Sequence, residues 1–588
     1  MEKLSALRKL MKDRGIDAYV IPSGDAHKTE YVAPYWGARK WFSGFTGSAG
    51  LVVVTLAEAG LWTDARYFIQ AEEQLKGTGI DLYKMGEPNV PKYEDFLLDK
   101  LPEGGKLGFD GRSMSIADFE MLKKKFEQKS ITYSYENDLV GEVWEDRPTL
   151  PTAIAFEHPP QFAGLSATEK LRTVREKMKA EGVSTYLVTS LTDIAWLLNM
   201  RGNDISYLPV VYSYVLITET EATIFVDKAK VADISGKLTS QGFTLAPYEA
   251  IPEKLKTLPT TDTIYYNKNK TNVLLAEAIP EGLERKLEIK NIIAHLKGAK
   301  SGHELANIKN AFVKEGVAMV KLLKWLDESV KAGKTLTEDE IAKTLTGIRK
   351  QQKDCLGDSF DTISAYGANG ALPHYRHEGD GATIKPEGFF LLDTGGQYLD
   401  GTTDTTRTVA VGPLTDEMKK DFTLVLKGHL AVNAAVFLAE TTGVAIDALA
   451  RQPILQDRQN FKHGTGHGIG YCLGVHEGPH GVSSRSTVAL VPGMLISNEP
   501  GIYKQGRYGI RTENVLAVRE LCKDDGNTFL HFENMTVCPY DTGAIVVEML
   551  TQIEKDTINL YHTMVYHTLA TMLAEDEKVW LENATKAI

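Results

Sequence analysis

Histidine and glycine are concentrated in one segment of the chain, residues 462–480. Four of the fourteen histidines lie in this segment, interleaved with six glycines. Histidine binds metals and carries protons near neutral pH, and glycine lets the backbone approach an ion or a substrate where a side chain would block it. A glycine-rich surface loop with incidental histidines is the simpler alternative. Acidic residues elsewhere in the chain favour a metal site instead.

Four acidic residues stand at the ends of predicted strands. Asp393 ends an apolar strand, and Asp404 lies on the strand that returns from it. Glu499 follows a second apolar run, and Glu513 leads into a further strand. A buried carboxylate is costly unless it is paired, hydrogen-bonded or bound to a cation. Each acid alone is more often a surface or capping residue, but four of them around a histidine–glycine segment favour one common site.

Two Asp, two Glu and one His would form a hard, oxygen-rich ligand set for two divalent ions that share carboxylates. Such a set suits Mn²⁺, Co²⁺ or Zn²⁺, whereas thiolate-rich sites favour softer metals. Two ions about 3.5–4 Å apart can hold a bridging water, lower its pKa and polarise a carbonyl. The residues therefore predict metal-assisted hydrolysis.

The sequence also predicts the elements that position these residues. We interpret residues 388–411 as two strands joined by a turn near Gly395 and Gly396. A long amphipathic helix is expected from about residue 304 to 326, because its apolar residues share one face. Thr337, with Glu340 three positions later, indicates the start of the next helix. A helical stretch is expected at 416–451, and an amphipathic helical tail at about 551–580 should pack on its own domain or on a partner subunit.

A helix–strand pattern near the N-terminus recurs 167 positions later. In each copy, apolar residues share one helical face, a glycine stops the helix and a buried strand follows. The matching residues are Leu4, Leu7, Met11 and Gly15 in the first copy and Leu171, Val174, Met178 and Gly182 in the second. Prolines between residues 147 and 163 disfavour regular structure. We therefore predict duplicated α/β domains at 1–150 and 160–297, followed by a catalytic domain at 298–588.

The composition excludes several classes of protein. The chain has 588 residues, 43% hydrophobic and 24% charged, as expected for a soluble globular protein of several domains. Its net charge of −12 argues against a nucleic-acid-binding surface. It has no secretory signal and no apolar run of the roughly 18–20 residues that span a membrane. The four cysteines have no CxxC spacing and suit reduced thiols, so we expect a cytoplasmic protein that binds neither nucleic acid nor membrane.

The order of the acids and His467 resembles that of the pita-bread metallopeptidase family. The motifs that carry this resemblance are LLDTGGQYLDGTTDTTRT, HGTGHGIGYCLGVHEGP, NEPG and IRTENV. More narrowly, the chain is similar to the three-domain cytosolic aminopeptidases P (Xaa-Pro aminopeptidases), whose first two domains are matched by SGDAHKTEYVAP, GFTGSAG, WTDARYF and DIAWLLNMRG. The resemblance implies an α/β (α+β) fold in which two creatinase-like α/β domains precede a pita-bread catalytic domain. It also implies a homodimer that hydrolyses the N-terminal Xaa–Pro bond of proline-containing peptides.

The resemblance assigns a metal-binding role to each matching position. Asp393 would chelate one of two divalent ions, usually Mn²⁺, and His467 with Glu499 would hold the other. Asp404 and Glu513 would bridge the two ions. Glu499 would also accept a proton from the attacking water between them.

The resemblance further implies a substrate side to the site. The expected substrate contacts are Arg66, His374, His463, His467, His476, Tyr503 and Arg511. Among them, His374 and His463 would stabilise the oxyanion and move protons, because a proline nitrogen leaves poorly without protonation. His476 would contact the bound peptide near the proline pocket. Arg511 and Tyr503 would orient ligands or substrate. A packing role alone is an equal alternative for Tyr503.

Two other functions are compatible with this pattern. A prolidase shares the ligand set but cleaves Xaa-Pro dipeptides, and the three-domain layout favours the aminopeptidase. A peptide- or histone-binding protein could use the same fold after losing its metal site. Retention of all five ligand positions argues against that second alternative.

Overall fold

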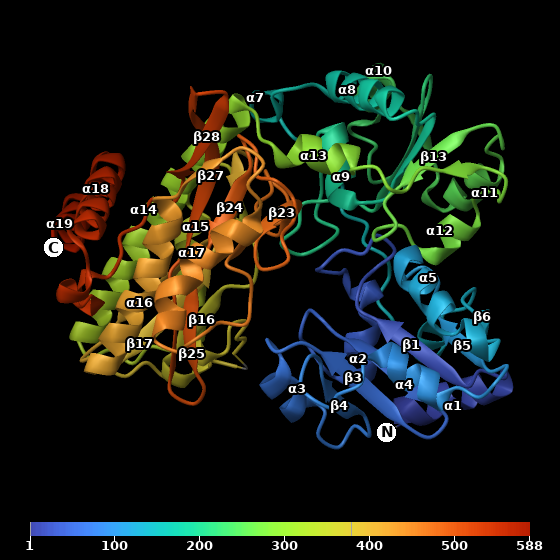
Figure 1. Ribbon diagram of the computed structural model, residues 1–588, viewed down its shortest axis with the longest axis horizontal. Coiled ribbons are helices and arrows are strands. Elements are labelled where there is room, and N and C mark those ends of the chain that lie inside the picture. The colour runs from blue at the N-terminus through green and yellow to red at the C-terminus, as the bar shows by residue number, and fades with distance from the viewer. Residues whose placement is uncertain (1, 378) are drawn as a thin grey trace. The chain divides into compact units, whose positions relative to one another are not determined.

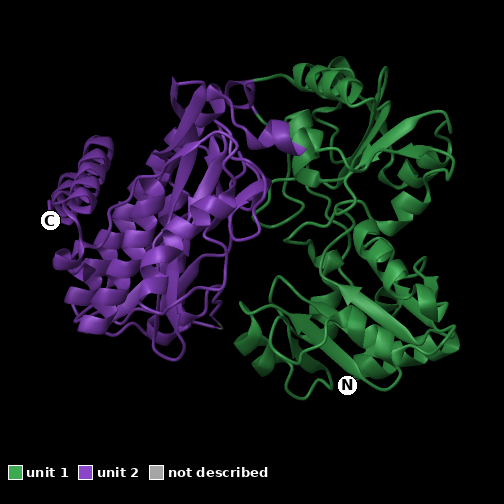
Figure 2. Ribbon diagram, viewed as in Figure 1, with its two compact units in different colours: residues 1–158, 165–293 green, residues 159–164, 294–588 purple. Residues whose placement is uncertain are grey.

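The computed structural model describes residues 2–377 and 379–588. Contacts within the chain divide it into two compact units, one of residues 1–158 with 165–293 and one of residues 159–164 with 294–588 (Figure 2). Both units mix helices and strands, so the predicted α/β (α+β) fold is confirmed. Among the described residues, no helix has both the length and the apolar character that a membrane span requires.

Each half of the first unit is built on a six-stranded sheet. The first sheet has the order β4 (Asp81–Lys84), β3 (Ala59–Thr63), β2 (Leu51–Thr55), β1 (Ala18–Pro22), β5 (Lys106–Phe109) and β6 (Thr132–Ser134). The second has the order β12 (Thr244–Ala246), β11 (Ala222–Val226), β10 (Ser213–Thr218), β8 (Thr185–Val188), β13 (Thr263–Tyr266) and β14 (Glu284–Arg285). The central strands β1 and β8 each pair antiparallel on one side and parallel on the other.

The helices of the two halves also correspond. Helix α1 (Glu2–Asp13) precedes β1, and α8 (Ala167–Ala180) precedes β8 (Figure 1). The predicted apolar faces of both helices are buried. The two halves therefore share one order of helices and strands, which confirms the duplication predicted from the sequence. The remaining longer helices of this unit are α2 (Ala38–Ser43), α3 (Phe68–Gln74), α4 (Tyr93–Lys100), α5 (Ile116–Lys125), α9 (Leu191–Leu198), α10 (Ser235–Ser240) and α11 (Ile251–Lys256).

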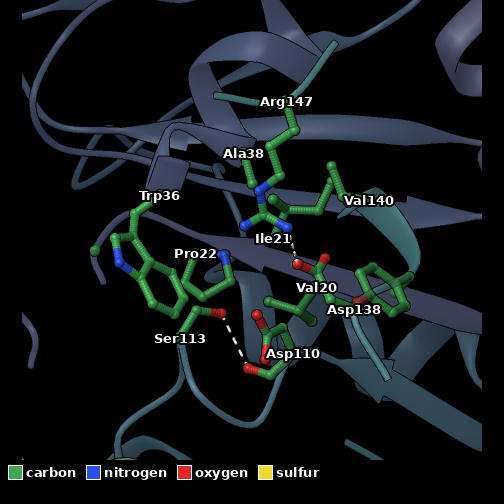
Figure 3. A pocket seen from close by; sticks show the side chains of 12 residues that line it. Val20, Ile21, Pro22, Trp36, Ala38, Asp110, Ser113, Asp138, Val140 and Arg147 are labelled. Atoms are coloured by element: carbon green, nitrogen blue, oxygen red, sulfur yellow. Dashed lines mark hydrogen bonds and ion pairs between the residues drawn. The ribbon is translucent and has the colours of Figure 1, made fainter. Parts of the chain in front are cut away.

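A cavity of about 20 Å³ lies at the carboxyl ends of the parallel strands β1 and β5 (Figure 3). Open α/β sheets commonly bind ligands at this place. Two of its lining charges, Arg147 and Asp138, pair with each other at 2.6 Å between Nη1 and Oδ2, and the lining Asp110 pairs with Arg112 at 3.0 Å. The remaining space suits about one water molecule. Beside these ion pairs, the position leaves little space for a ligand.

The two halves of the first unit meet at a buried polar and aromatic cluster. The His27 ring is completely buried and stacks on Tyr214 at 4.3 Å between centroids. Its Nδ1 lies 2.7 Å from the Thr189 carbonyl oxygen, and its Nε2 lies 2.9 Å from the Tyr248 hydroxyl. These contacts join residue 27 of the first half to three residues of the second.

Within its described residues, the second unit combines long helices with four sheets. The helices are α14 (Gly302–Lys331), α15 (Glu338–Arg349), α16 (Asp416–Asn433), α17 (Gly443–Gln456), α18 (Gln552–Leu569) and α19 (Glu575–Ala584). The largest sheet has the order β21 (Val436–Leu438), β28 (Asn527–Asn534), β27 (Asn514–Asp524), β24 (Leu495–Asn498), β22 (Gly466–Gly468) and β23 (Glu477–Val482). Figure 1 shows α14, α16 and α17 alongside the strands of this unit.

Three small sheets complete this unit. They are β15 (Cys355–Asp358) with β18 (Gly396–Tyr398) and β19 (Gly401–Thr402), β16 (Ile363–Tyr366) with β17 (Phe389–Thr394) and β20 (Thr405–Ala410), and β25 (Gly501–Lys504) with β26 (Tyr508–Arg511). The predicted start of α15 is confirmed, because the Thr337 hydroxyl accepts a hydrogen bond from the Glu340 amide. Helix α14 starts with a capping box between Ser301 and Glu304.

Two details of the predicted local structure were wrong. Strands β17 and β20 pair directly, as expected, but the chain between them forms a second hairpin in another sheet, so its turn is not at Gly395. A Cβ at Gly395 would lie 1.9 Å from the Thr403 carbonyl oxygen, so this glycine permits a close crossing of two chain segments. The expected helix at 416–451 is two helices, α16 and α17, separated by β21.

The predicted helical tail is formed by α18 and α19. On α18, Ile558, Val565 and Leu569 are buried, whereas Ile553 and Leu560 are 76% and 71% exposed. One apolar side of this helix therefore packs on its own unit, and a second apolar row faces outward.

Candidate metal centre

Three of the predicted ligands form a compact cluster in the second unit. One ligand atom each of Asp404, His467 and Glu513 lie within 4.8 Å of one another. His467 Nε2 is 3.6 Å from Asp404 Oδ2 and 3.5 Å from Glu499 Oε1. Asp404 lies just before β20 and His467 lies on β22. Glu499 follows β24 directly, and Glu513 lies just before β27.

Asp393 is brought to the same place by the β17–β20 pairing. It lies opposite Thr406, whose hydroxyl donates to Glu513 Oε2 at 2.8 Å. Asp393 Oδ2 accepts a hydrogen bond from Arg511 Nη2 at 2.6 Å. Its other oxygen, Oδ1, is buried and has no hydrogen-bond partner among the described residues. Such an atom needs a partner, because an unsatisfied buried acceptor is costly.

A glycine and a serine set the position of His467 beside Glu499. A Cβ at Gly466 would lie 1.7 Å from the Ser497 carbonyl oxygen, so glycine is required where β22 runs against β24. The Ser497 hydroxyl accepts from the His467 amide at 2.9 Å and donates to Glu499 Oε1 at 3.2 Å. One hydroxyl therefore links the backbone of the histidine to the side chain of the acid.

The carboxylates carry more negative charge than the surrounding protein balances. Burial and the neighbouring carboxylates hold the pKa values of Asp404 and Glu513 well above their usual range. Burial also raises the pKa of Glu499 to about 8, with the Arg511 charge opposing and the Asp393 charge adding to the rise. A bound divalent cation would neutralise this charge and satisfy Asp393 Oδ1. The oxygen-rich donor set thus fits divalent cations.

A hydrogen-bonded chain runs from this cluster to His463. Arg511 Nη1 donates to the Tyr503 hydroxyl at 2.8 Å, and that hydroxyl lies 2.8 Å from His463 Nε2. The hydroxyl proton is therefore available for Nε2, while Nδ1 lies 2.7 Å from the Gly464 carbonyl oxygen. This pattern assigns the neutral His463 ring a proton on Nδ1. Tyr503 consequently has polar contacts beyond packing.

The remaining predicted substrate residues differ in their surroundings. His476 is exposed, and its ring stands edge-on to His467 at 4.3 Å between centroids. His374 is half-buried, and the carbonyl oxygen of the preceding Pro373 accepts from Arg511 Nη2 at 3.4 Å. Arg66 belongs to the first unit, where its Nη2 pairs with Asp64 Oδ2 at 2.8 Å. Its contact with a peptide remains a prediction.

Three supporting residues were missed from the sequence: Thr406, Ser497 and Arg407. Arg407 is only 1% exposed, and it donates to the Glu513 carbonyl oxygen at 2.6 Å and the Pro539 carbonyl oxygen at 2.9 Å. The run TTRT was visible as part of a motif, but nothing in it distinguishes a buried arginine from an exposed one. His480, the last histidine of the 462–480 segment, is buried with Nε2 at 2.7 Å from the Leu495 carbonyl oxygen.

Comparison with known proteins covers the whole chain. Residues 306–520 match metallopeptidase family M24, and residues 528–588 match the C-terminal region of that family. Residues 3–137 and 146–304 each match the creatinase/prolidase N-terminal domain. The chain is 40% identical to a probable Xaa-Pro aminopeptidase P of Laccaria bicolor, covering 99% of this chain and 92% of the relative. It is 37% identical to aminopeptidase P2 of Arabidopsis thaliana, covering 100% of this chain and 88% of the relative.

Solved structures agree with this relationship. The X-prolyl aminopeptidase of Caenorhabditis elegans, described as a cytosolic enzyme with a di-nuclear active site, is 33% identical with a TM-score of 0.96, over 100% of this chain and 99% of that one. The Xaa-Pro dipeptidase of Bacillus anthracis is 25% identical with a TM-score of 0.51, and it covers 64% of this chain and 99% of its own. On its full-length similarity, the chain belongs to metallopeptidase family M24, in the group formed by the aminopeptidases P.

Proposed function

We propose that this enzyme hydrolyses the N-terminal Xaa–Pro bond of peptides and releases the first amino acid. The observation that carries the proposal is the cluster of four carboxylates and His467, which lies in a chain similar to aminopeptidases P along its whole length. Similarity to the Bacillus anthracis dipeptidase reaches only 64% of the chain, so it supports the dipeptidase alternative less.

The proposed ligands are Asp393, Asp404, His467, Glu499 and Glu513. They suit two divalent cations, with Mn²⁺ proposed and Co²⁺ or Zn²⁺ as alternatives. When bound, these cations would lower the pKa of a water molecule and polarise the scissile carbonyl.

Glu499 is the proposed proton acceptor. Its Oε1 is held by the Ser497 hydroxyl and lies 3.5 Å from His467 Nε2, so the carboxylate has a defined position. A base held in position at a site of this kind contributes about 10²–10⁴-fold to a rate.

Histidines act on the peptide side of the same site. His463, with a proton on Nδ1 and its Nε2 at the Tyr503 hydroxyl, can relay a proton through that hydroxyl. His374 is proposed to stabilise the oxyanion, and His476 to contact the peptide near proline. Arg66 of the first unit is proposed to contact the peptide as well.

Location and assembly are also proposals. The Caenorhabditis elegans relative is described as cytosolic, and we propose the same location here. We further propose a homodimer, because Ile553 and Leu560 form an exposed apolar row on α18. Sedimentation of the purified protein tests that state.

A cleavage assay tests the proposed function. With Mn²⁺ added, the enzyme should release the first residue of a Xaa-Pro-Yaa tripeptide faster than it cleaves the matching Xaa-Pro dipeptide. A preference for the dipeptide would identify a prolidase instead. Absence of hydrolysis together with absence of bound transition metal would support a peptide-binding protein.

Chelation tests the metal requirement. Removal of divalent cations should abolish hydrolysis and lower the melting temperature, because cations that bind only the folded state stabilise it. Re-addition of Mn²⁺, Co²⁺ or Zn²⁺ one at a time should then identify the metal that restores the greatest activity. Full activity after exhaustive chelation would contradict the proposed ligand set.

A further inference from the structure

Glu338, the first residue of α15, is a completely buried carboxylate outside the metal centre. Its oxygens accept hydrogen bonds from four donor groups in one part of the chain, the described residues 366–377 and 379–382. The donors are the Tyr366 amide at 2.7 Å, Asn369 Nδ2 at 2.9 Å, the Tyr375 hydroxyl at 2.8 Å and the Ala382 amide at 2.7 Å. Among the described residues, no lysine or arginine forms an ion pair with it, since Lys343 and Arg349 of the same helix pair with Asp339 and Glu315.

Hydrogen bonds can stabilise the buried Glu338 carboxylate without a neighbouring cation. An ionised carboxylate is an acceptor only, and charge-assisted hydrogen bonds to it are stronger than neutral ones. The positive end of the α15 dipole adds to this stabilisation, since Glu338 occupies the first turn. A glutamine could not reproduce the arrangement, because its NH₂ group would face donors instead of accepting from them.

The segment held by Glu338 contains His374. On one side of that histidine, the Pro373 carbonyl oxygen accepts from Arg511 Nη2 at 3.4 Å. On the other side, the Tyr375 hydroxyl donates to Glu338 Oε2 at 2.8 Å and accepts from Asn369 Nδ2 at 2.9 Å. Both neighbours of His374 are therefore anchored, one to the metal centre and one to Glu338.

Backbone packing fixes the start of the same segment. The short helix η4 (Gly367–Ala371) lies against β26, the strand that carries Arg511. A Cβ at Gly509 of β26 would lie 1.6 Å from the Gly370 carbonyl oxygen, so only glycine allows this approach. The position of the segment is thus determined relative to the strand that contacts Asp393.

We propose that Glu338 is a positioning residue that holds His374 at the metal centre through the Tyr375 hydroxyl and the backbone of the segment. This inference rests on the proposed function, because it assigns Glu338 to the peptide reaction through His374. A displacement of about 1 Å in a catalytic group can lower a rate about 10²-fold. Loss of Glu338 should therefore reduce kcat and leave KM nearly unchanged, since the metal ligands and the other peptide contacts stay in place.

The test is a double-mutant cycle with Glu338→Gln and His374→Ala, measured on a Xaa-Pro-Yaa tripeptide with Mn²⁺. Alone, Glu338→Gln should lower kcat about 10–100-fold, and Tyr375→Phe should lower it less. In the His374→Ala background, Glu338→Gln should change kcat by no more than about twofold, because the residue acts through His374. If the kcat losses of the two single variants multiply in the double variant, the proposal is overturned.

A matched control and a second readout separate positioning from folding. Glu340→Gln removes the same charge from the same helical turn at an exposed position, and it should leave kcat unchanged. Amide hydrogen exchange should become faster in residues 366–377 and 379–382 of Glu338→Gln and of Tyr375→Phe, while α14 keeps its protection. If Glu338→Gln does not fold, the cycle is run with Tyr375→Phe.

The outcomes distinguish the two proposals. A wild-type enzyme that does not cleave the tripeptide contradicts the proposed function, and hydrogen exchange then still decides whether Glu338 orders the segment. If the wild-type enzyme cleaves the tripeptide, but the kcat losses multiply or hydrogen exchange in residues 366–377 and 379–382 is unchanged, only the role of Glu338 is contradicted.

Discussion

Arg511 links the carboxylate side of the metal centre to its histidine side. Through Nη2 it donates to Asp393 at 2.6 Å, and through Nη1 it donates to the Tyr503 hydroxyl at 2.8 Å. Because a guanidinium presents several donors in a fixed plane, one residue can orient both partners. Its single charge does not balance four carboxylates, which leaves the site attractive to divalent cations.

Replacement of Glu499 or His467 should remove catalysis without unfolding the protein. Glu499→Gln keeps the shape of the side chain but eliminates the proton acceptor, so we expect Xaa-Pro-Yaa cleavage to fall by at least about 10²-fold. His467→Ala should have a similar effect through loss of a proposed metal ligand. Cleavage rates and circular dichroism are measured together. Substantial activity in either folded variant would show that the site has been assigned to the wrong residues.

Tyr503→Phe distinguishes a polar role for this hydroxyl from packing alone. The substitution removes the link between Arg511 and His463 and preserves the ring, so we expect kcat/KM to fall about tenfold. Tyr508→Phe is the matched control on the same two-stranded sheet, because its hydroxyl donates to Asp421 at 2.8 Å. Equal kinetics in Tyr503→Phe and the wild type would favour the packing interpretation.

At the level of elements, the metal centre depends on strands that cross at close range. Strand β17 passes from one small sheet toward the hairpin β18–β19 of another, and the chain then returns as β20. Gly395 lies at the first crossing, and Gly466 lies where β22 meets β24. These close approaches set the positions of Asp404 and His467, which neither strand could determine alone.

Gly395→Ala should therefore damage both stability and activity. Its Cβ would meet the Thr403 carbonyl oxygen at 1.9 Å, and this backbone atom can move only by displacing the adjacent Asp404. We expect about 1–3 kcal/mol of destabilisation and a loss of tripeptide cleavage. Gly347→Ala in α15 is the control, because a Cβ there meets nothing within 4 Å and alanine favours a helix by about 1 kcal/mol. Urea unfolding and cleavage rates are measured for both variants. Wild-type stability and activity in Gly395→Ala would show that glycine is not required where the two segments cross.

At the level of the whole molecule, the duplicated halves of the first unit share one buried interface. His27 of the first half contacts Thr189, Tyr214 and Tyr248 of the second half. Burial lowers the pKa of His27 from 6.5 to about 4, although the Asp25 charge and the Thr189 carbonyl oppose the shift. The folded protein therefore keeps this histidine neutral in a range where an unfolded chain would protonate it.

The sign of the resulting pH dependence follows from that difference. Below pH 6.5 the unfolded chain binds a proton that folded His27 binds only near pH 4, so this residue makes the protein less stable as the pH falls through that window. The full effect of such a pKa shift on the free energy of unfolding is about 3 kcal/mol. Urea unfolding at pH 7 and pH 5 should show a smaller loss of stability in His27→Gln than in the wild type. An equal loss in both would mean that His27 does not titrate on unfolding.

Local patterns in the sequence were sufficient for many features of the fold. Helix faces, the Thr337 cap and the repeated helix–strand unit depend on neighbouring residues, and the structure contains all of them. The turn assigned to Gly395 was wrong because two adjacent glycines resemble a local turn, whereas Gly395 is needed for contact with Thr403. The helix expected at 416–451 was divided because β21 pairs with the distant strand β28.

The sequence by itself determined which acids and which histidine could form a metal site. The ability to bind a metal depends on the type of side chain, and both the types and their order can be read along the chain. Only the tertiary structure decided how they meet: β17–β20 pairing places Asp393 opposite Thr406, and Thr406 contacts Glu513 from a distant loop. The supports Ser497, Arg407 and Glu338 likewise depend on contacts between residues far apart in the chain or buried by other elements. The physical reason is that ligand chemistry belongs to a side chain, whereas burial, hydrogen-bond partners and close backbone approach belong to the folded molecule.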